Sequence, residues 1–270
     1  MSAEQPFSEY GVMPNPNRTD DVGVEARYFR EYGVHNVDDL VSVFSFPDWA
    51  GLEQALLTEL PDSGVVLTTE LATFTGPHEE LVGSANAIEE RVEFVRECSA
   101  GTDAEIWLGA PIVPPTEWHD WRNSVLTFVR GEIVGRTDKI LLSAYEQAHS
   151  PVKRAPRESA RFVNPIGMSA LICSDMIASS SMKYMGRQWP GKTLLIPTCW
   201  ASVPKDAEMD EWRAGWIEKS GGVDNYFKSQ LERGVRMAFE ASDAETIIVA
   251  DRNAPNSGVD GPYNAVFYRV

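Results

Sequence analysis

The sequence predicts a layered α/β or mixed α+β fold built as a single domain. Short apolar runs, many of them rich in β-branched residues, alternate with longer segments whose apolar residues recur at helical spacing. Hairpin-like pairs of such runs interrupt the alternation. The chain has 270 residues, 43% of them hydrophobic, which is enough for one large α/β domain. It contains no fixed-period repeat, so one domain is the simplest interpretation.

The first 38 residues differ from the rest of the chain in composition and in their lack of a regular apolar pattern. They are polar and irregular: "PNPNRTDD" is typical of a loop, and "VEARYFREYG" could form one helix. We therefore expect an N-terminal extension over residues 1–38 and a folded domain over residues 39–270.

The first half of the domain alternates strands with helices. "LVSVFSF", "SGVVLTTEL" and "EIWLGAPIV" are apolar runs that predict buried strands. "PDWAGLEQALLTEL" begins with Pro and Asp at helix-start positions, and residues 78–98 place five apolar side chains on one helical face. "RNSVLTFV" and "EIVGRTDKIL", joined by the turn "RGE", predict a hairpin.

The second half continues in the same way. "GMSALICSDMI" and "KTLLIPTCW" predict two further apolar strands. "NYFKSQLERGVRMAFEAS" is amphipathic and predicts a helix, after which "ETIIVADRN" and "NAVFYRV" predict the last two strands. This mixture of alternating units and hairpins excludes an all-helical or all-β fold.

The composition excludes several classes of partner. Lys plus Arg number 24 against 40 Asp plus Glu, a formal charge of −16, which argues against binding nucleic acid or an anionic membrane. No apolar run approaches the roughly 20 residues of a membrane span, and the first residues lack the features of a secretory signal. The three cysteines are too few and too scattered for a disulfide framework, and the four histidines lack the spacing of metal ligands. We expect a cytoplasmic protein that needs no metal or other cofactor.

Three ionisable residues stand at or just beyond the ends of predicted strands, namely Glu70, Lys139 and Cys173. Ligand sites in open α/β sheets gather at strand ends. Each residue also has a purely structural interpretation: the cysteine as a small buried hydrophobe, the lysine as a polar strand end, and the glutamate as the partner of a buried arginine. Taken singly, the structural interpretation is the stronger one.

Read together, the surrounding segments resemble the nitrilase, or carbon–nitrogen hydrolase, superfamily. The segments that carry the resemblance follow one another in the expected order over residues 40–260: "GVVLTTELATFTG", "RNSVLTFVRGEIVGRTDK", "GMSALICSDM", "LLIPTCW", "MAFE" and "IIVADRN". The resemblance implies a four-layer α-β-β-α sandwich. It also implies a catalytic triad of Glu70 as general base, Lys139 as oxyanion stabiliser and Cys173 as nucleophile.

The resemblance implies further site residues and an assembly. Glu146 lies where the family often has a second glutamate that positions substrate, although it could equally be a solvated loop acid. Trp200 and Ser174 are further candidates for substrate positioning, and a serine after the nucleophile departs from the family's bulkier residue. The family commonly forms homodimers, so we expect a homodimer or a higher homo-oligomer.

The expected activity is thiol-dependent cleavage of a non-peptide C–N bond in a small amide or N-carbamoyl compound. An N-acyltransferase that uses an amine acceptor and a nitrilase are alternatives within the superfamily. A binding module that keeps the fold without catalysis is the alternative from another class. The loops that line the pocket determine the substrate, and the sequence alone does not show how these loops are arranged.

Overall fold

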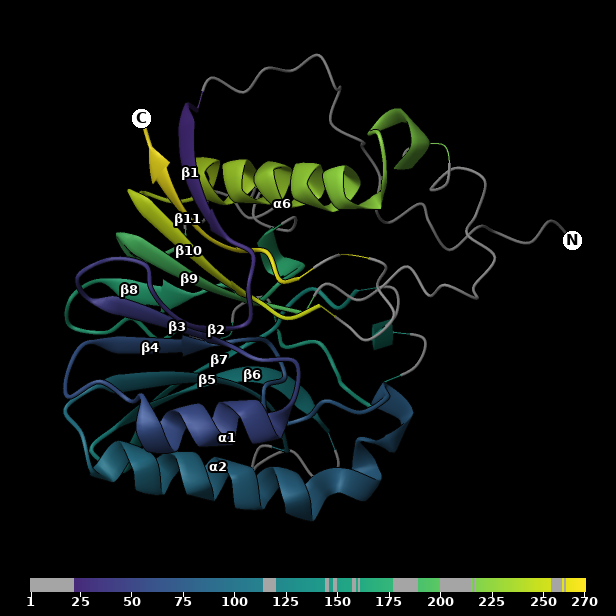
Figure 1. Cartoon of the computed structure of the whole chain (residues 1–270). Coiled ribbons are helices and arrows are strands. Elements are labelled where there is room, and N and C mark those ends of the chain that lie inside the picture. The colour runs from purple at the N-terminus through teal and green to yellow at the C-terminus, as the bar shows by residue number, and fades with distance from the viewer. Residues whose placement is uncertain are drawn as a thin grey trace, which may run out of the picture.

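The structure is a computed structural model, and Figure 1 shows it whole. It describes the following residues: 22–113, 120–143, 146–147, 150–156, 159, 161–176, 189–199, 215, 217–253, 259 and 261–270. Within these ranges two β-sheets lie face to face. Helix α6 (Val223–Glu240) lies on the outer side of one sheet, and α1 (Trp49–Thr58) and α2 (Ala85–Ala100) lie on the outer side of the other (Figure 1). The expected four-layer α-β-β-α architecture is confirmed.

One sheet has five strands in the order β1-β11-β10-β9-β8. Its members are β1 (Val24–Phe29), β8 (Met168–Ala170), β9 (Thr193–Thr198), β10 (Thr246–Asp251) and β11 (Asn264–Arg269). Strands β8, β9 and β10 are parallel, while β11 is antiparallel to both β10 and β1. The parallel strands therefore end at the same edge of the sheet.

The second sheet has six strands in the order β2-β3-β4-β5-β6-β7. Its members are β2 (Gly33–Asn36), β3 (Val41–Ser45), β4 (Val65–Thr68), β5 (Glu105–Ile112), β6 (Arg122–Val129) and β7 (Glu132–Asp138). Strands β3, β4 and β5 are parallel, and β6 is antiparallel to both β5 and β7. Because two reversals restore the direction, β7 ends at the same edge as β4.

The side-chain alternation of the strands separates the apolar core into layers. In β10, Ile247 and Val249 pack with the α6 cluster, while Ile248 and Ala250 face the other sheet. Both faces of this strand are buried, which explains its uninterrupted apolar sequence. A third cluster fills the space between the six-stranded sheet and its two helices.

The helices are those that the sequence predicts. Helix α1 (Trp49–Thr58) begins after Asp48, whose side chain accepts a hydrogen bond from the Gly51 N–H at 2.9 Å. Two 3-10 turns, His78–Glu80 and Val82–Ser84, lead into α2 (Ala85–Ala100). Helix α6 (Val223–Glu240) turns its apolar stripe toward the five-stranded sheet. No helix within the described ranges is both long and apolar enough to cross a membrane.

The sequence prediction was wrong for residues 24–36. The expected helix in "VEARYFREYG" is instead β1, which pairs with β11, and β2 pairs with β3 in the other sheet. Val24 and Tyr28 pack against the α6 cluster from alternate positions of β1. Residues 24–36 therefore belong to the sheets rather than to an extension, and residues 1–21 lie outside the described residues.

Candidate active site

The side chains that the sequence singles out converge where the two sheets end. Glu70 follows β4 and Lys139 follows β7, at one edge of the six-stranded sheet. Cys173 follows β8, and Cys199 directly follows β9, at one edge of the five-stranded sheet. The face-to-face packing of the sheets joins these two edges, so Cys199 comes into contact with Glu70, 129 positions earlier in the sequence.

Glu70 is a buried carboxylate whose two oxygens are both engaged. It is 3% exposed. Its Oε1 accepts hydrogen bonds from Lys139 Nζ at 2.6 Å and from Asn123 Nδ2 at 2.7 Å. Its Oε2 accepts the Cys199 backbone N–H at 2.9 Å. These donors compensate the burial of the charge and hold the carboxylate in one orientation.

Lys139 lies between two carboxylates. Its Nζ contacts Glu70 Oε1 at 2.6 Å and Glu146 Oε2 at 2.7 Å, and the side chain is almost fully buried. Burial disfavours the ammonium form, but Glu146 and Glu70 outweigh it and raise the pKa of Lys139 well above its ordinary value. Lys139 is therefore a permanent cation at neutral pH.

Glu146 belongs to the same cluster, so the interpretation as a solvated loop acid is wrong. It is 4% exposed and accepts hydrogen bonds from Asn123 Nδ2 at 2.9 Å and from the Ser143 N–H at 2.8 Å. Burial alone would raise the pKa of its carboxyl group, but the Lys139 ammonium brings that pKa below its ordinary value. The cluster of Glu70, Lys139 and Glu146 thus carries two negative charges and one positive charge.

Asn123 donates a hydrogen bond to each of the two carboxylates, Glu70 and Glu146. This role was not predicted from the sequence. It stands near the start of β6 and is 1% exposed. Both N–H bonds of its amide are used, one on Glu70 and one on Glu146. A polar side chain inside the apolar run "RNSVLTFV" was the available signal.

Cys173 lies on a sharp turn that follows β8, three residues after the strand ends at Ala170. Its φ is +45°, in the left-handed region that side-chain-bearing residues rarely adopt. The turn is held by the Cys173 N–H on Pro197 O at 3.1 Å and by the Met176 N–H on Cys173 O at 3.0 Å. Strained backbone of this kind costs about 1–3 kcal/mol and concentrates at functional sites.

The thiol of Cys173 lies close enough to the Glu70 carboxylate for the two groups to interact. Burial of the sulfur and the negative charge of Glu70 raise the pKa of the thiol well above its ordinary value, and the opposing effect of Lys139 is smaller. In the resting site the sulfur is therefore a neutral thiol beside a carboxylate, an arrangement in which ionisation requires a base.

Ser174 and Asp175 attach the cysteine turn to the loop after Lys139. The Ser174 hydroxyl donates to Leu141 O. The Asp175 carboxylate accepts the Ile140 N–H at 3.1 Å and the Leu141 N–H at 2.7 Å. Burial raises the pKa of Asp175 to about 6, and Arg161 opposes that rise. The side chain of Ser174 thus holds neighbouring backbone, and Trp200 lies outside the described residues.

The other two cysteines, Cys98 and Cys199, differ in their surroundings. Cys98 is a packing residue, because it lies on α2 against the apolar cluster of the six-stranded sheet. Cys199 instead lies at the site: its N–H binds Glu70, and its sulfur is 3.6 Å from Arg252 Nη2. In the described part of the chain, no cluster of three or more His, Cys, Asp or Glu residues could hold a metal ion.

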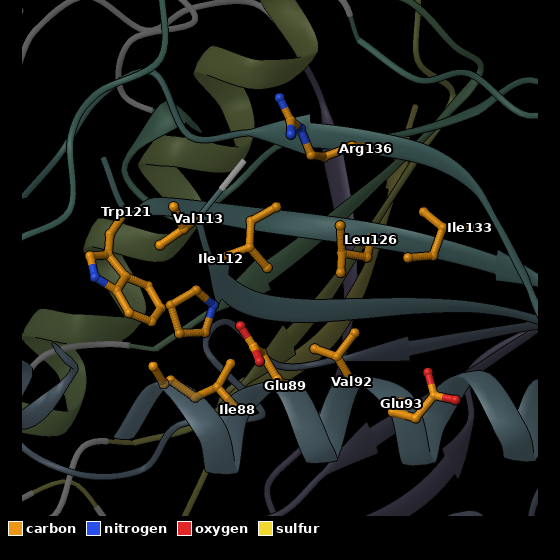
Figure 2. Close-up of a pocket in the computed structure, with 12 residues that line it drawn as sticks. Ile88, Glu89, Val92, Glu93, Ile112, Val113, Trp121, Leu126, Ile133 and Arg136 are labelled. Carbon is orange, nitrogen blue, oxygen red and sulfur yellow. The ribbon is translucent and has the colours of Figure 1, made fainter. Parts of the chain in front are cut away.

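A cavity of about 490 Å³ lies elsewhere, between α2 and the outer face of the six-stranded sheet. Figure 2 shows Ile88 and Val92 of α2 on one side and Ile112 and Leu126 of the sheet on the other. Its lining is mainly apolar and contains none of Glu70, Lys139 and Cys173. The cavity is therefore separate from the ionised cluster.

Comparison with known proteins supports the fold. No model of a protein family matches the sequence, and no curated protein matches it. Among solved structures, a carbon–nitrogen hydrolase from Helicobacter pylori superposes with a TM-score of 0.52 at 13% identity, covering 89% of this chain and 80% of that one.

A variant of the amidase from Nesterenkonia sp. superposes with a TM-score of 0.50 at 12% identity, covering 91% of this chain and 90% of that one. That variant carries the acetamide moiety of fluoroacetamide covalently at its active-site cysteine. The Nesterenkonia amidase is a member of the nitrilase superfamily.

The chain therefore has the four-layer fold of the carbon–nitrogen hydrolases. At the level of the fold, the resemblance to the nitrilase superfamily is confirmed.

Proposed function

We propose that the protein is an amidase-type hydrolase that cleaves a non-peptide C–N bond of a small amide or N-carbamoyl compound through a thioester on Cys173. One observation carries the proposal: a buried carboxylate, Glu70, lies beside the only described thiol on a left-handed turn and accepts a hydrogen bond from a buried ammonium. Base, nucleophile and cation are the three groups that acyl transfer through cysteine requires.

In the acylation step, Glu70 would accept the proton of the Cys173 thiol as the sulfur attacks the carbonyl carbon. The tetrahedral oxyanion needs donors. Lys139 uses two of its three N–H bonds on Glu70 and Glu146, which leaves the third for substrate. The backbone N–H of Ser174, which follows the nucleophile, would be the second donor.

Protonated Glu70 would then give its proton to the nitrogen of the leaving group, and the C–N bond breaks. Water attacks the resulting thioester while Glu70 accepts a proton from that water. The C–S bond then breaks, the acid product leaves, and Glu70 returns the proton to the Cys173 sulfur. Because Asn123, Lys139 and the Cys199 N–H keep Glu70 in place, one carboxylate would serve both half-reactions.

The test is ammonia release from a panel of small amides, N-carbamoyl compounds and nitriles. We expect turnover with amides or carbamoyl compounds and no turnover in Cys173→Ala. Fluoroacetamide should leave an adduct on Cys173, which peptide mass spectrometry would locate. Failure of every compound, or an adduct on another residue, would contradict the proposal.

The same panel separates the alternatives. Added hydroxylamine should divert part of the acyl group to a hydroxamate if an amine can replace water. Faster turnover in the presence of an amine than in water alone would favour an N-acyltransferase. Turnover of nitriles without amides would favour a nitrilase, and an unreactive Cys173 would favour a binding module.

A further inference from the structure

Arg252 is a buried cation beside the proposed active site that the mechanism does not use. It follows the last residue of β10 and is 5% exposed. Its backbone N–H donates to Thr198 O at 3.1 Å, which places it at the edge of the sheet where β9 ends. Cys173 and Cys199 lie at the same edge.

The guanidinium group is poorly satisfied by the described residues. Nη2 contacts Phe74 O at 3.3 Å and Cys199 Sγ at 3.6 Å. Nε and Nη1 are buried and have no hydrogen-bond partner. No ion pair among the described residues includes Arg252. Three of its five N–H bonds are therefore withdrawn from water without an acceptor, which is costly for a charged group.

Arg252 lies next to the ionised cluster. Cys199 links the two, because its N–H binds Glu70 Oε2 while its sulfur contacts Arg252. The imidazole of His78 lies within electrostatic reach of all four charged groups: Glu146, Glu70, Lys139 and Arg252. Phe74, whose carbonyl Arg252 binds, belongs to the loop that follows Glu70.

We propose that Arg252 binds a carboxylate of the substrate, so that the substrate class is a small amide or carbamoyl compound that also carries a carboxylate. This inference rests on the proposed function and deepens it. A guanidinium group donates charge-assisted N–H bonds to a carboxylate, and the unpartnered Nε–H and Nη1–H bonds of Arg252 are available as donors.

The charge of the surroundings favours a single negative charge on the ligand. Glu70, Glu146 and Lys139 together carry a net charge of −1, and Arg252 adds a positive charge next to them. A bound monoanion adds one negative charge opposite Arg252, whereas a more highly charged group would meet the two carboxylates and the negative field of a chain of net charge −16. The position of Arg252 beyond Cys199 places the carboxylate at the end of the substrate remote from the amide.

The first experiment compares amides that differ only by a carboxylate in place of a methyl group. The pairs are malonamate with propionamide, succinamate with butyramide and glutaramate with pentanamide. For at least one pair we expect the wild type to favour the acid by roughly 10- to 100-fold in kcat/KM, the range of a charge-assisted hydrogen bond. In Arg252→Gln the preference should fall toward one, mainly through KM, and Arg252→Lys should retain part of it.

The matched control is Arg91, which donates to Thr73 O of the same loop at 2.7 Å from the α2 side. Arg91→Gln should affect the acid and the neutral amide of each pair alike. A preference that survives in Arg252→Gln, or that is lost equally in Arg91→Gln, would overturn the assignment.

A binding measurement separates this inference from the proposed function. Calorimetry on Cys173→Ala with succinamate and butyramide requires no turnover and no substitution at position 252. If no amide is hydrolysed by the wild type but the acid binds more tightly than its neutral partner, the proposed function fails and the assignment of Arg252 stands. Equal or undetectable binding of all three acids and their partners would overturn the assignment.

Discussion

At the scale of single residues, the site depends on how Glu70 distributes its hydrogen bonds. The carboxylate accepts hydrogen bonds from Lys139, Asn123 and the Cys199 N–H. It also lies beside the Cys173 thiol. The same negative charge that would take the proton therefore keeps the resting sulfur protonated. Substitution of Glu70 should separate these two effects.

We expect Glu70→Gln to make Cys173 easier to ionise while it abolishes most of the turnover. Burial and the Glu70 charge hold the pKa of the thiol above its ordinary value, so removing that charge leaves Lys139 to stabilise the thiolate. Modification by methyl methanethiosulfonate, followed by peptide mass spectrometry, should show a rate that rises at lower pH in Glu70→Gln than in the wild type.

Glu93→Gln is the control for that experiment, because Glu93 is an exposed acid on α2 that pairs with Arg96. Its pH profile for Cys173 should match that of the wild type. An unchanged or more alkaline profile in Glu70→Gln would show that Glu70 does not control the thiol.

Lys139→Met should lower the free energy of unfolding by roughly 3–5 kcal/mol, because it leaves two buried carboxylates without their cation. One of them would have to take up a proton, so the loss should be smaller in acid than at neutral pH. Urea unfolding at both pH values measures this.

A double-variant cycle provides the control. Adding Glu146→Gln to Lys139→Met removes one of the uncompensated charges and should recover part of the lost stability. Additive losses in the double variant would mean that the two side chains do not share one electrostatic cluster.

At the scale of secondary-structure elements, the end of β4 is positioned by the strand next to it. Gly109 of β5 lies so close to the segment after β4 that a Cβ atom there would be 2.1 Å from Thr69 O and 3.0 Å from Glu70 Cα. The Gly109 N–H also donates to Thr68 Oγ1 at 3.0 Å. A residue without a side chain is therefore needed for Glu70 to reach the site.

Gly109→Ala should displace the backbone of Glu70 and lower both stability and turnover. Overpacking of this kind typically costs about 1–3 kcal/mol, and kcat should fall because the carboxylate moves relative to Cys173. Thermal unfolding and amide turnover measure the two effects. Gly83→Ala is the control, since a Cβ atom at Gly83 meets nothing within 4 Å, and it should change neither quantity. Normal turnover in Gly109→Ala would contradict this account of the element.

At the scale of the whole molecule, the two outer layers differ in their expected role. By resemblance to the superfamily, the face of α6 that points away from the sheet is proposed to form a homodimer interface. The resemblance also implies a second interface helix in "MIASSSMKYMG", residues 176–186. Most of that second helix, residues 177–186, lies outside the described residues. The proposal assigns no interface to the outer layer of α1 and α2.

We expect sedimentation at micromolar concentration to give a dimer, and Ser229→Arg, on the exposed face of α6, to shift it toward the monomer. Gln54→Arg, on the exposed face of α1, should leave the dimer intact. Since each chain carries a formal charge of −16, association should strengthen with added salt. A monomeric wild type at every salt concentration would contradict the proposal.

Much of the fold and the core of the candidate site could be predicted from local sequence. Apolar runs with turns between them mark nearly every strand of the two sheets, and helical spacing marks α1, α2 and α6. Glu70, Lys139 and Cys173 could be named because each follows a predicted strand. These features depend on short-range periodicity, which a single sequence carries in full.

The tertiary structure alone decided which of those strand ends meet. The pairing of β1 with β11, and the meeting of Asn123, Glu146 and Glu70, depend on strand order and on the packing of one sheet against the other. The same holds for the unpartnered guanidinium of Arg252. Contacts between residues far apart in sequence leave no local periodic pattern, so the burial and pairing of these charges follow only from the assembled sheets.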